Sequence, residues 1–335
     1  MKVDAHLIER LEQAPQRASE IETLGYDGLL TVELDHDPFF PLLLAAQNTQ
    51  RIELMTGIAV AFARNPMLLA NIGWDLQAYS KGRFSLGLGS QIKPHITKRF
   101  SMPWSQPAAR MQELIEAIRA IWASWQNNTR LNFRGDFYQH TLMTPMFNPG
   151  PNPYGNPRIA LAAVGPMMTK VVGRVADGFM AHAFQTADYL RQVTYPALHA
   201  GLAESGRSRE DIEVICPLFV VSGFDEADTA ERKAACKQQI AFYGSTPAYI
   251  GVLDYHGWGD AHYELNSLSK QGKWVEMANV IDDTMLDHFA IVGEPQEIAA
   301  RVKARFGDLA DRVQLTMPSA ENELWQPVIA AIGKN

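Results

Sequence analysis

The sequence predicts a (β/α)8 barrel with insertions, and three observations support this fold class. Apolar runs alternate with amphipathic segments eight times along the 335 residues. The runs are continuous, which is typical of strands buried on both faces in a parallel sheet. Polar side chains follow several of the runs, and sites in such barrels lie at the carboxyl ends of the strands. We expect a single barrel domain over residues 1–335, because barrels commonly reach this length as one domain.

Turn-forming residues bound the expected strands, and a segment of helical periodicity follows each one. Gly25 ends the first helix, and Pro66 opens the helix after the third strand. Gly57 lies inside the third strand, which indicates a bulge or a close approach of the backbone. The eight strands are expected at residues 3–7, 29–32, 52–60, 84–88, 159–164, directly after 177–178, at 213–221 and at 312–317.

Two segments depart from this alternation. Residues 126–157 contain the stretch from Phe133 to Tyr138, which is typical of a small hairpin, and then a proline-rich loop. Residues 244–285 are rich in Gly, Tyr, Trp and His. We interpret both segments as excursions from the barrel.

Composition excludes several classes of partner and site. The net charge of −7 and the absence of a long basic run argue against nucleic acid as a partner. Cys216 and Cys236 have neither CxxC nor metal-like spacing, so we expect neither a disulfide nor a metal site. The N-terminus is charged and no run of about 18 apolar residues occurs. We therefore expect no membrane contact and a cytoplasmic location.

The turn between the fifth strand and its helix is a candidate phosphate site. Gly165 lets the backbone approach a ligand, Pro166 suits the first helical position, and the amides of Met167 and Met168 would point at a bound anion. An ordinary strand-to-helix turn needs similar residues, so the spacing alone leaves both interpretations open. Neither a GxGxxG nor a P-loop motif occurs here. The candidate residues are Ala163, Val164, Gly165, Pro166, Met167 and Met168.

Further polar residues gather at the carboxyl ends of the other expected strands. Because the strand ends of a barrel surround one mouth, we expect these residues around a common site. They are His6 at the first strand, Glu33 and His36 after the second, Thr56 with the adjacent Gly57 in the third, Ser90, Gln91 and His95 after the fourth, His182 after the sixth and Ser222 after the seventh.

Four stretches together resemble the bacterial luciferase-like monooxygenase superfamily: KGRFSLGLGSQ, IELMTGIAV, FRGDFYQHTLMTP and IALAAVGPMMTKVVGRVADGF. The resemblance covers nearly the whole chain and implies a luciferase-like barrel. The finer match is to the coenzyme F-420-dependent oxidoreductases of the superfamily. Within them, an uncharacterised branch is similar in ELDHDPFFPL, GSQIKPHITKRFSMPWS and FYGSTPAYIGVLDYHGWG.

The resemblance implies roles for several residues. It places the cofactor phosphate at Val164 to Met168, and it implies a non-prolyl cis peptide at Gly57-Ile58 behind the cofactor ring. The family's glucose-6-phosphate dehydrogenases carry an Asp-His pair after strand two and a Glu after strand four. Here Glu33 and Leu34 stand at the pair, and the Glu has no clear counterpart. A sugar phosphate is therefore not the expected substrate.

Proton transfer has four candidates, His36, Glu33, His95 and His182. Histidine titrates near neutral pH, which suits a general acid–base beside a carbon that exchanges hydride. His36 is the first choice; the alternative for each histidine is a loop cap or a cofactor contact. Glu33 either shares the proton work or pairs with a nearby arginine. The basic cluster that includes Lys93 either meets the phosphate or oligoglutamate tail of F-420 or is a solvated helix end.

Three functions follow from these observations. The first is an F-420-dependent oxidoreductase that transfers a hydride between the deazaflavin and a small organic substrate. The second is an FMN-dependent monooxygenase served by a separate reductase. The third is a cofactor-binding barrel without turnover. By analogy with the superfamily we also expect a homodimer.

Overall fold

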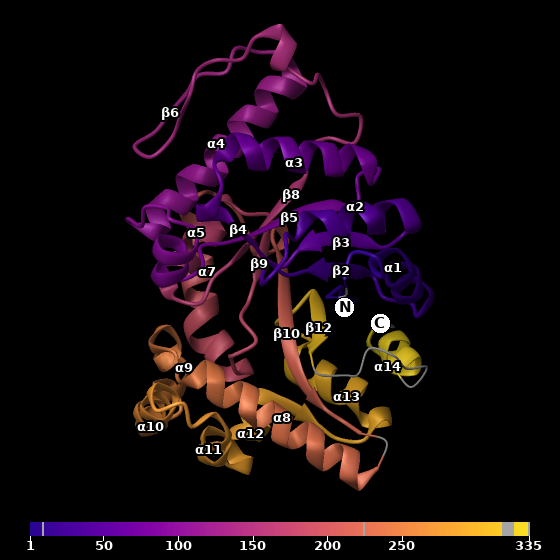
Figure 1. The fold of residues 1–335 in the computed structure, drawn as a ribbon, viewed down its shortest axis with the longest axis vertical. Coiled ribbons are helices and arrows are strands. Elements are labelled where there is room, and N and C mark those ends of the chain that lie inside the picture. Colours follow the sequence, from indigo (N-terminus) through magenta and orange to yellow (C-terminus); the bar gives the residue numbers. More distant parts are fainter. Residues whose placement is uncertain (9, 224, 317–324, 334–335) are drawn as a thin grey trace. The chain divides into compact units, whose positions relative to one another are not determined.

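The computed structural model describes residues 1–8, 10–223, 225–316 and 325–333 (Figure 1). The chain divides into two compact units. The C-terminal unit consists of Met1–Asp4, Ala181–Pro196 and Val214–Asn335, and the N-terminal unit consists of Ala5–Met180 and Ala197–Glu213. The single domain expected over residues 1–335 stays a prediction.

A parallel sheet forms the centre of the N-terminal unit. Its strands are adjacent in the order β2, β3, β5, β8 and β9, and β4 pairs with the end of β5. All four residues of β2 are buried, as expected for a strand that is covered on both faces. The bounds are β2 (Gly28–Thr31), β3 (Glu53–Thr56), β4 (Ala59–Val60), β5 (Phe84–Gly89), β8 (Arg158–Ala162) and β9 (Gly178–Met180).

Helices follow these strands, and local capping defines where several of them begin. The side chain of Asn65 accepts the Leu68 amide at the start of α3, and Pro66 occupies the first helical position. The helical elements are α1 (Ala14–Thr23), α2 (Phe39–Asn48), η1 (Ala61–Ala63), α3 (Pro66–Tyr79), η2 (His95–Arg99), α4 (Pro107–Asn127), α5 (Pro166–Val175), most of α7 (Tyr195–Glu204) and η5 (Arg209–Asp211).

The expected hairpin in the first excursion is confirmed. Strands β6 (Phe133–Arg134) and β7 (Gln139–His140) pair antiparallel, and η3 (Pro145–Phe147) follows them. The Glu113 carboxylate on α4 accepts the amides of Asp136, Phe137 and Tyr138 at 2.6–2.8 Å. Three otherwise unpaired amides thus fix the hairpin turn to the helix.

The C-terminal unit contains the second set of parallel strands, in the order β1, β12, β10 and β11. Asp4 on β1 and Arg312 on β12 form a buried ion pair with two contacts of 2.7 Å. Each charge is neutralised and hydrogen-bonded by the other, which offsets the cost of removing both from water. The bounds are β1 (Lys2–His6), β10 (Glu213–Val221), β11 (Ala290–Val292) and β12 (Arg312–Thr316); Met317, at the end of the expected strand, lies outside the described residues.

The second excursion is helical. Its short helices gather around α8 (Figure 1), and a common apolar core includes Ile240, Leu253, Leu265, Met277 and Leu286. The elements of this unit are α6 (Ala187–Tyr189), η4 (Leu190–Thr194), α8 (Glu226–Gly244), η6 (Pro247–Tyr249), α9 (Ile250–Tyr255), α10 (Gly259–Lys270), α11 (Trp274–Met277), η7 (Ala278–Val280), α12 (Asp283–Phe289), α13 (Pro295–Phe306) and α14 (Trp325–Gly333).

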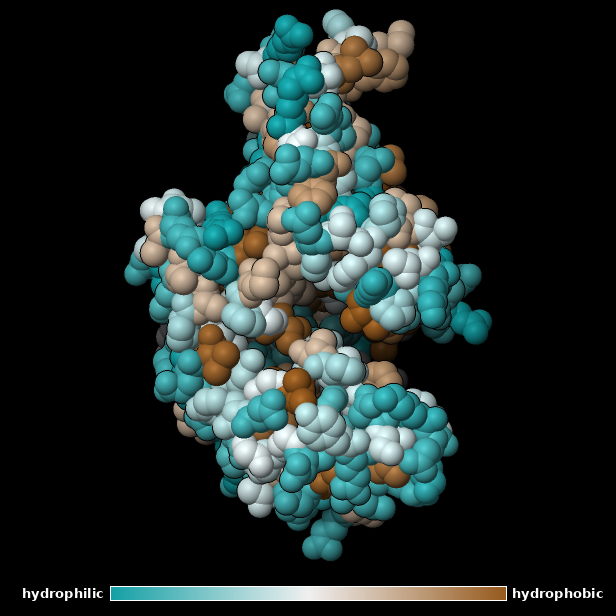
Figure 2. Space-filling view, turned by 90° about the vertical axis from the view of Figure 1, so that its left-hand side faces the viewer, coloured by the Kyte–Doolittle hydropathy of each residue, from teal (hydrophilic) through white to brown (hydrophobic). Residues whose placement is uncertain are grey.

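Hydrophilic residues prevail on the face drawn in Figure 2, where hydrophobic residues occur as scattered spots. None of the helices in the described part of the chain combines the length and the apolar content that a membrane span needs.

Candidate functional site

The third expected strand is interrupted at its carboxyl end, between β3 and β4. The peptide bond between Gly57 and Ile58 is cis, as the resemblance implied. A Cβ at position 57 would lie 2.7 Å from Leu30 Cδ2, and a Cβ on Gly89 would lie 2.8 Å from Ile58 Cγ1. A side chain at position 57 would therefore displace Leu30, and one at position 89 would displace Ile58. The half-buried residues Gly57 and Ile58 present their backbone and the Ile58 side chain at this strand end.

Thr56, the last residue of β3, links this strand end to β5. Its fully buried hydroxyl donates to Gly87 O at 2.7 Å and accepts the Gly87 amide at 2.9 Å. A Cβ on Gly87 would lie only 1.7 Å from Thr56 O, so β3 and β5 approach more closely here than a side chain permits. The hydroxyl is thus engaged within the sheet, and a contact of Thr56 with a cofactor stays a prediction.

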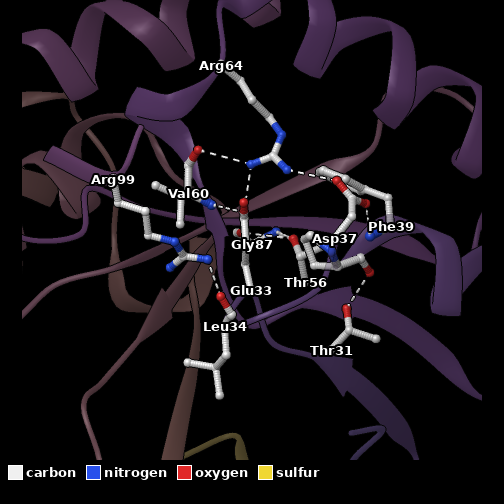
Figure 3. A network of polar contacts seen from close by, with 11 residues as sticks. Thr31, Glu33, Leu34, Asp37, Phe39, Thr56, Val60, Arg64, Gly87 and Arg99 are labelled. Carbon is white, nitrogen blue, oxygen red and sulfur yellow. Dashed lines mark hydrogen bonds and ion pairs between the residues drawn. The ribbon is translucent and has the colours of Figure 1, made fainter. Parts of the chain in front are cut away.

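Glu33 pairs with an arginine, which is the second of its two expected alternatives. Its Oε2 accepts Arg64 Nη1 at 2.6 Å and the Val60 amide at 2.7 Å (Figure 3). Arg64 Nη2 donates to Asp37 Oδ2 at 2.9 Å, and Asp37 Oδ1 accepts the Phe39 amide at the start of α2. Only 8% of Glu33 is exposed. The carboxylate is therefore part of a buried network.

Arg64 was missed in the sequence analysis, although the sequence contains a signal for it. It is the only charged residue between Glu53 and Asp75. A single charge in an apolar stretch near buried strands requires a partner of opposite sign. The partners could not be read from the sequence, because Glu33 and Asp37 lie 31 and 27 residues away along the chain.

His36 lies on the loop that this network anchors. Its side chain is 76% exposed, and Nε2 is 3.6 Å from Asp35 Oδ2. The loop backbone is fixed on both sides, since Arg99 Nη2 donates to Leu34 O and Arg64 binds Asp37 (Figure 3). His36 therefore has a fixed backbone and a side chain that solvent reaches.

The residues after β5 separate into two groups. Ser90 and Gln91 are half-buried; the Ser90 hydroxyl donates to Gln91 O at 3.1 Å, and Gln91 has a φ of +57°. Lys93 and His95 are exposed, and His95 begins the π-helical turn η2. The two half-buried side chains lie at the strand end, whereas the two basic ones extend into solvent.

The expected helix start at Pro166 is confirmed, and no side chain caps it. Gly165 is the N-cap residue, and its carbonyl accepts the amide and the hydroxyl of Thr169, each at 3.0 Å. A Cβ at Gly165 would enter open space, and Met167 is 75% exposed. Of the preceding residues, Ala163 is buried and Val164 half-buried. The amides of Met167 and Met168, in the first turn of α5, are thus accessible to an anion.

His182 lies in the C-terminal unit, within an aromatic cluster. Its ring stacks on Tyr249 at a centroid distance of 4.4 Å and meets the Tyr243 ring edge-on at 4.7 Å. Nδ1 accepts the Phe184 amide at 3.0 Å, and Nε2 lies 3.1 Å from the Tyr249 hydroxyl. Because Nδ1 is an acceptor, the neutral ring carries its proton on Nε2 and donates it to Tyr249.

Burial sets the protonation of this pair. It lowers the pKa of His182 to about 4 and raises the pKa of Tyr249 to about 12. At neutral pH the imidazole is uncharged and the phenol is protonated. Tyr249 as the partner of His182 had no signal in the sequence, because the two residues are 67 positions apart.

The described residues contain no group of three or more His, Cys, Asp or Glu side chains arranged to hold a metal ion. Cys216 and Cys236 are both buried.

The comparisons with known proteins identify the family. The sequence model of the luciferase-like monooxygenase family matches residues 2–312, so the chain belongs to this family. An uncharacterized protein of Mycobacterium tuberculosis (strain ATCC 25618 / H37Rv) is 53% identical over 323 residues, which are 96% of this chain and 95% of the relative. The 5,10-methylenetetrahydromethanopterin reductase of Archaeoglobus fulgidus is 27% identical over 268 residues, 78% of this chain and 75% of the relative.

Solved structures confirm the predicted (β/α)8 fold class. The coenzyme F-420-dependent tetrahydromethanopterin reductase of Methanopyrus kandleri has a TM-score of 0.80 at 18% identity and covers 98% of this chain and 97% of its own. The oxygenating constituent of 3,6-diketocamphane monooxygenase from Pseudomonas putida, solved with FMN, has a TM-score of 0.66 at 15% identity, with coverages of 100% and 97%. At these identities the likeness establishes the fold alone. Membership of the family supports an oxidoreductase or monooxygenase.

Proposed function

We propose that the chain is a coenzyme F-420-dependent oxidoreductase that transfers a hydride between the deazaflavin and a small organic substrate. The observation that carries the proposal is the strand end at Gly57 and Ile58, which are half-buried. It lies beside the end of β5, which leads into the half-buried Ser90 and Gln91. A planar ring system packs well on such a surface. The coenzyme F-420-dependent reductase of Methanopyrus kandleri supports F-420 as the cofactor.

The residues of the N-terminal unit fit a phosphorylated deazaflavin. Ile58, Ser90 and Gln91 would hold the ring, and the uncapped start of α5 would hold the phosphate through free amides and the helix dipole. When bound, the deazaflavin supplies the hydride chemistry at its ring. The basic side chains of Lys93, Lys98 and Arg99 suit an oligoglutamate tail. Arg99 already donates to Leu34 O, so the two exposed lysines are the principal candidates.

For the proton, we propose His36 as the first acid–base candidate, since its imidazole is accessible and its loop is fixed. His95 is exposed and has no fixing side-chain partner among the described contacts, which makes it a weaker candidate. His182 would act through the Tyr249 hydroxyl, which is held in its protonated form. Glu33 is engaged by Arg64 and the Val60 amide, which favours a supporting role.

An FMN-dependent monooxygenase is the alternative function, and the FMN-bound structural relative supports it. Both cofactors carry a phosphate, and they differ at the central ring atom that accepts the hydride. A carbon there passes hydride, whereas a nitrogen supports reaction with oxygen.

Equilibrium binding of the apo-protein to F-420 and to FMN, followed by fluorescence, tests the proposal. We expect tight binding of F-420 and little binding of FMN. Preference for FMN would favour the monooxygenase. Binding of neither cofactor at micromolar concentration would contradict both functions, whereas tight binding without turnover of any small carbonyl or alcohol would favour the non-catalytic barrel.

A further inference from the structure

Arg64 connects three segments of the N-terminal unit through one guanidinium group (Figure 3). Nη1 contacts Glu33 Oε2 after β2 at 2.6 Å and the carbonyl of Val60 on β4 at 3.3 Å. Nη2 contacts Asp37 Oδ2 at the entry to α2 at 2.9 Å. The Phe39 ring lies below the guanidinium, with 5.3 Å from Cζ to the ring centroid. The plane and both ends of the guanidinium are thus fixed.

The network holds β4 through both polar groups of one residue. The Val60 amide donates to the Glu33 carboxylate at 2.7 Å, and the Val60 carbonyl accepts from Arg64. Strand β4 in turn pairs with β5 in the register Ala59 to Leu88 and Val60 to Gly89. Gly89 is also the residue against which Ile58 packs. The position of the Gly57–Val60 segment relative to β5 therefore depends on the Glu33–Arg64 pair.

From these contacts we infer that Arg64 is a positioning residue of the cofactor site: together with Glu33 and Asp37 it sets the Gly57–Val60 strand end and the loop that carries His36. The inference rests on the proposed function for the identity of the ligand. Arg64 itself needs no contact with the cofactor, because it acts through Val60 and Asp37. The same network assigns Glu33 a structural task in place of proton transfer.

Lysine cannot replace Arg64 in this arrangement. The guanidinium uses two nitrogens that point toward different carboxylates, whereas an ammonium is a single point charge. Removal of the arginine alone would also leave Glu33 as an unpaired charge that is only 8% exposed, and this alone can prevent folding. A double substitution that removes both charges, Glu33→Gln with Arg64→Met, separates positioning from charge burial.

The test compares four proteins by cofactor affinity, kcat, KM and amide hydrogen exchange. They are the wild type, Arg64→Lys, the double variant Glu33→Gln/Arg64→Met, and Arg119→Lys as a control. Arg119 also binds an aspartate, Asp177, at 2.8 Å, but it lies on the outer helix α4. For Arg64→Lys and for the double variant we expect cofactor affinity and kcat to fall by about tenfold or more, since a small misplacement of site residues strongly lowers the rate. The Val60 amide should exchange faster in both, and the control should match the wild type.

Two results would overturn the inference: wild-type affinity and kcat in the folded double variant, or an unchanged exchange rate of the Val60 amide in Arg64→Lys. Failure of the proposed function is distinguishable, because it would show as loss of cofactor binding by the wild type itself. The exchange measurement needs no cofactor, so it decides the effect of Arg64 on β4 in that case as well.

Discussion

The histidines of this chain differ in what surrounds them, and the difference determines their chemistry. His36 is exposed and lies beside Asp35. His182 is buried among aromatic rings and accepts a hydrogen bond from the Phe184 amide. An exposed imidazole is accessible to solvent and to a bound molecule. A buried one remains neutral until the pH falls far below its ordinary pKa.

This burial predicts a pH-dependent stability. The pKa of His182 is 6.5 in an exposed setting and about 4 in the folded protein, so the unfolded chain binds a proton first as the pH falls. The contribution of the neutral His182 to the free energy of unfolding is constant above pH 6.5. It is lost progressively as the pH falls from 6.5 to 4. From this group alone we expect roughly 2 kcal/mol less stability at pH 5 than at pH 7.

Urea unfolding of the wild type and of His182→Asn at the two pH values measures this contribution. The asparagine side-chain oxygen can accept the Phe184 amide, but it does not titrate. The variant should therefore be less stable at pH 7 but show a smaller loss on acidification. Equal losses of stability between pH 7 and pH 5 in the wild type and the variant would contradict the assignment of this pH dependence to His182.

Charged residues show how far the sequence alone could define the site. The sequence placed Glu33 at the carboxyl end of the second strand, because an acidic residue directly follows an apolar run. It could not choose between a catalytic carboxylate and an ion pair, since the choice depends on Arg64, which is 31 residues away. Non-local contacts of this kind are set by the packing of strands and loops, and no local pattern encodes them.

At the scale of elements, the strands were predictable because burial on both faces leaves a continuous apolar run. The helices of residues 244–285 were not, since they are short and their apolar residues serve a core shared with α8. Leu253 and Leu265, for example, are fully buried there. Their burial is a tertiary property, whereas the helix start at Pro166 follows from local preferences and was therefore predictable.

The contact between β3 and β5 predicts a strongly destabilising substitution. In Gly87→Ala the new Cβ would lie 1.7 Å from the carbonyl oxygen of Thr56, and a backbone atom cannot move aside as a flexible side chain can. We expect a loss of about 3 kcal/mol or more. The matched control is Gly206→Ala, where φ is +69° and a Cβ meets open space, so only the backbone strain of about 1–2 kcal/mol is expected. Thermal unfolding of both variants checks that Gly87→Ala is the more destabilising of the two.

The start of α5 allows stability and anion binding to be separated. Gly165→Asp places a good N-cap residue in open space at a permitted φ of −85°, so helix stability should be unchanged or rise by about 1 kcal/mol. The added carboxylate would also repel a phosphate. We expect F-420 binding to weaken by about tenfold or more, which corresponds to about 1.4 kcal/mol.

Gly165→Ser is the control for that substitution, since serine caps the helix without adding a charge. It should bind the cofactor better than the aspartate variant does. If the aspartate variant kept wild-type affinity, the phosphate would lie elsewhere.

At the scale of the whole molecule, the outer face of α2 and α3 carries an exposed apolar groove. A groove of about 740 Å³ is lined mainly by apolar side chains, including Phe40, Leu43, Leu76 and Tyr79. Phe40 is 59% exposed and Tyr79 48%. Exposed patches of this kind on soluble proteins commonly mark an interface. We propose that a second copy of the chain covers this groove and forms the expected homodimer.

Light scattering after gel filtration tests the dimer through Leu43→Lys, a substitution in the lining of the groove. Leu43 is 42% exposed, so the lysine should be tolerated by the fold, but it would bring two positive charges into a two-fold interface. The wild type should have twice the 37.3 kDa mass of one chain, and the variant should shift toward a single chain at micromolar concentration.

Leu142→Lys, at a residue that is 76% exposed on the hairpin excursion, should leave the mass unchanged. A wild type that stays monomeric at every concentration would show that the groove serves another purpose, whereas equal masses for the wild type and the Leu43 variant would place the interface on a different face.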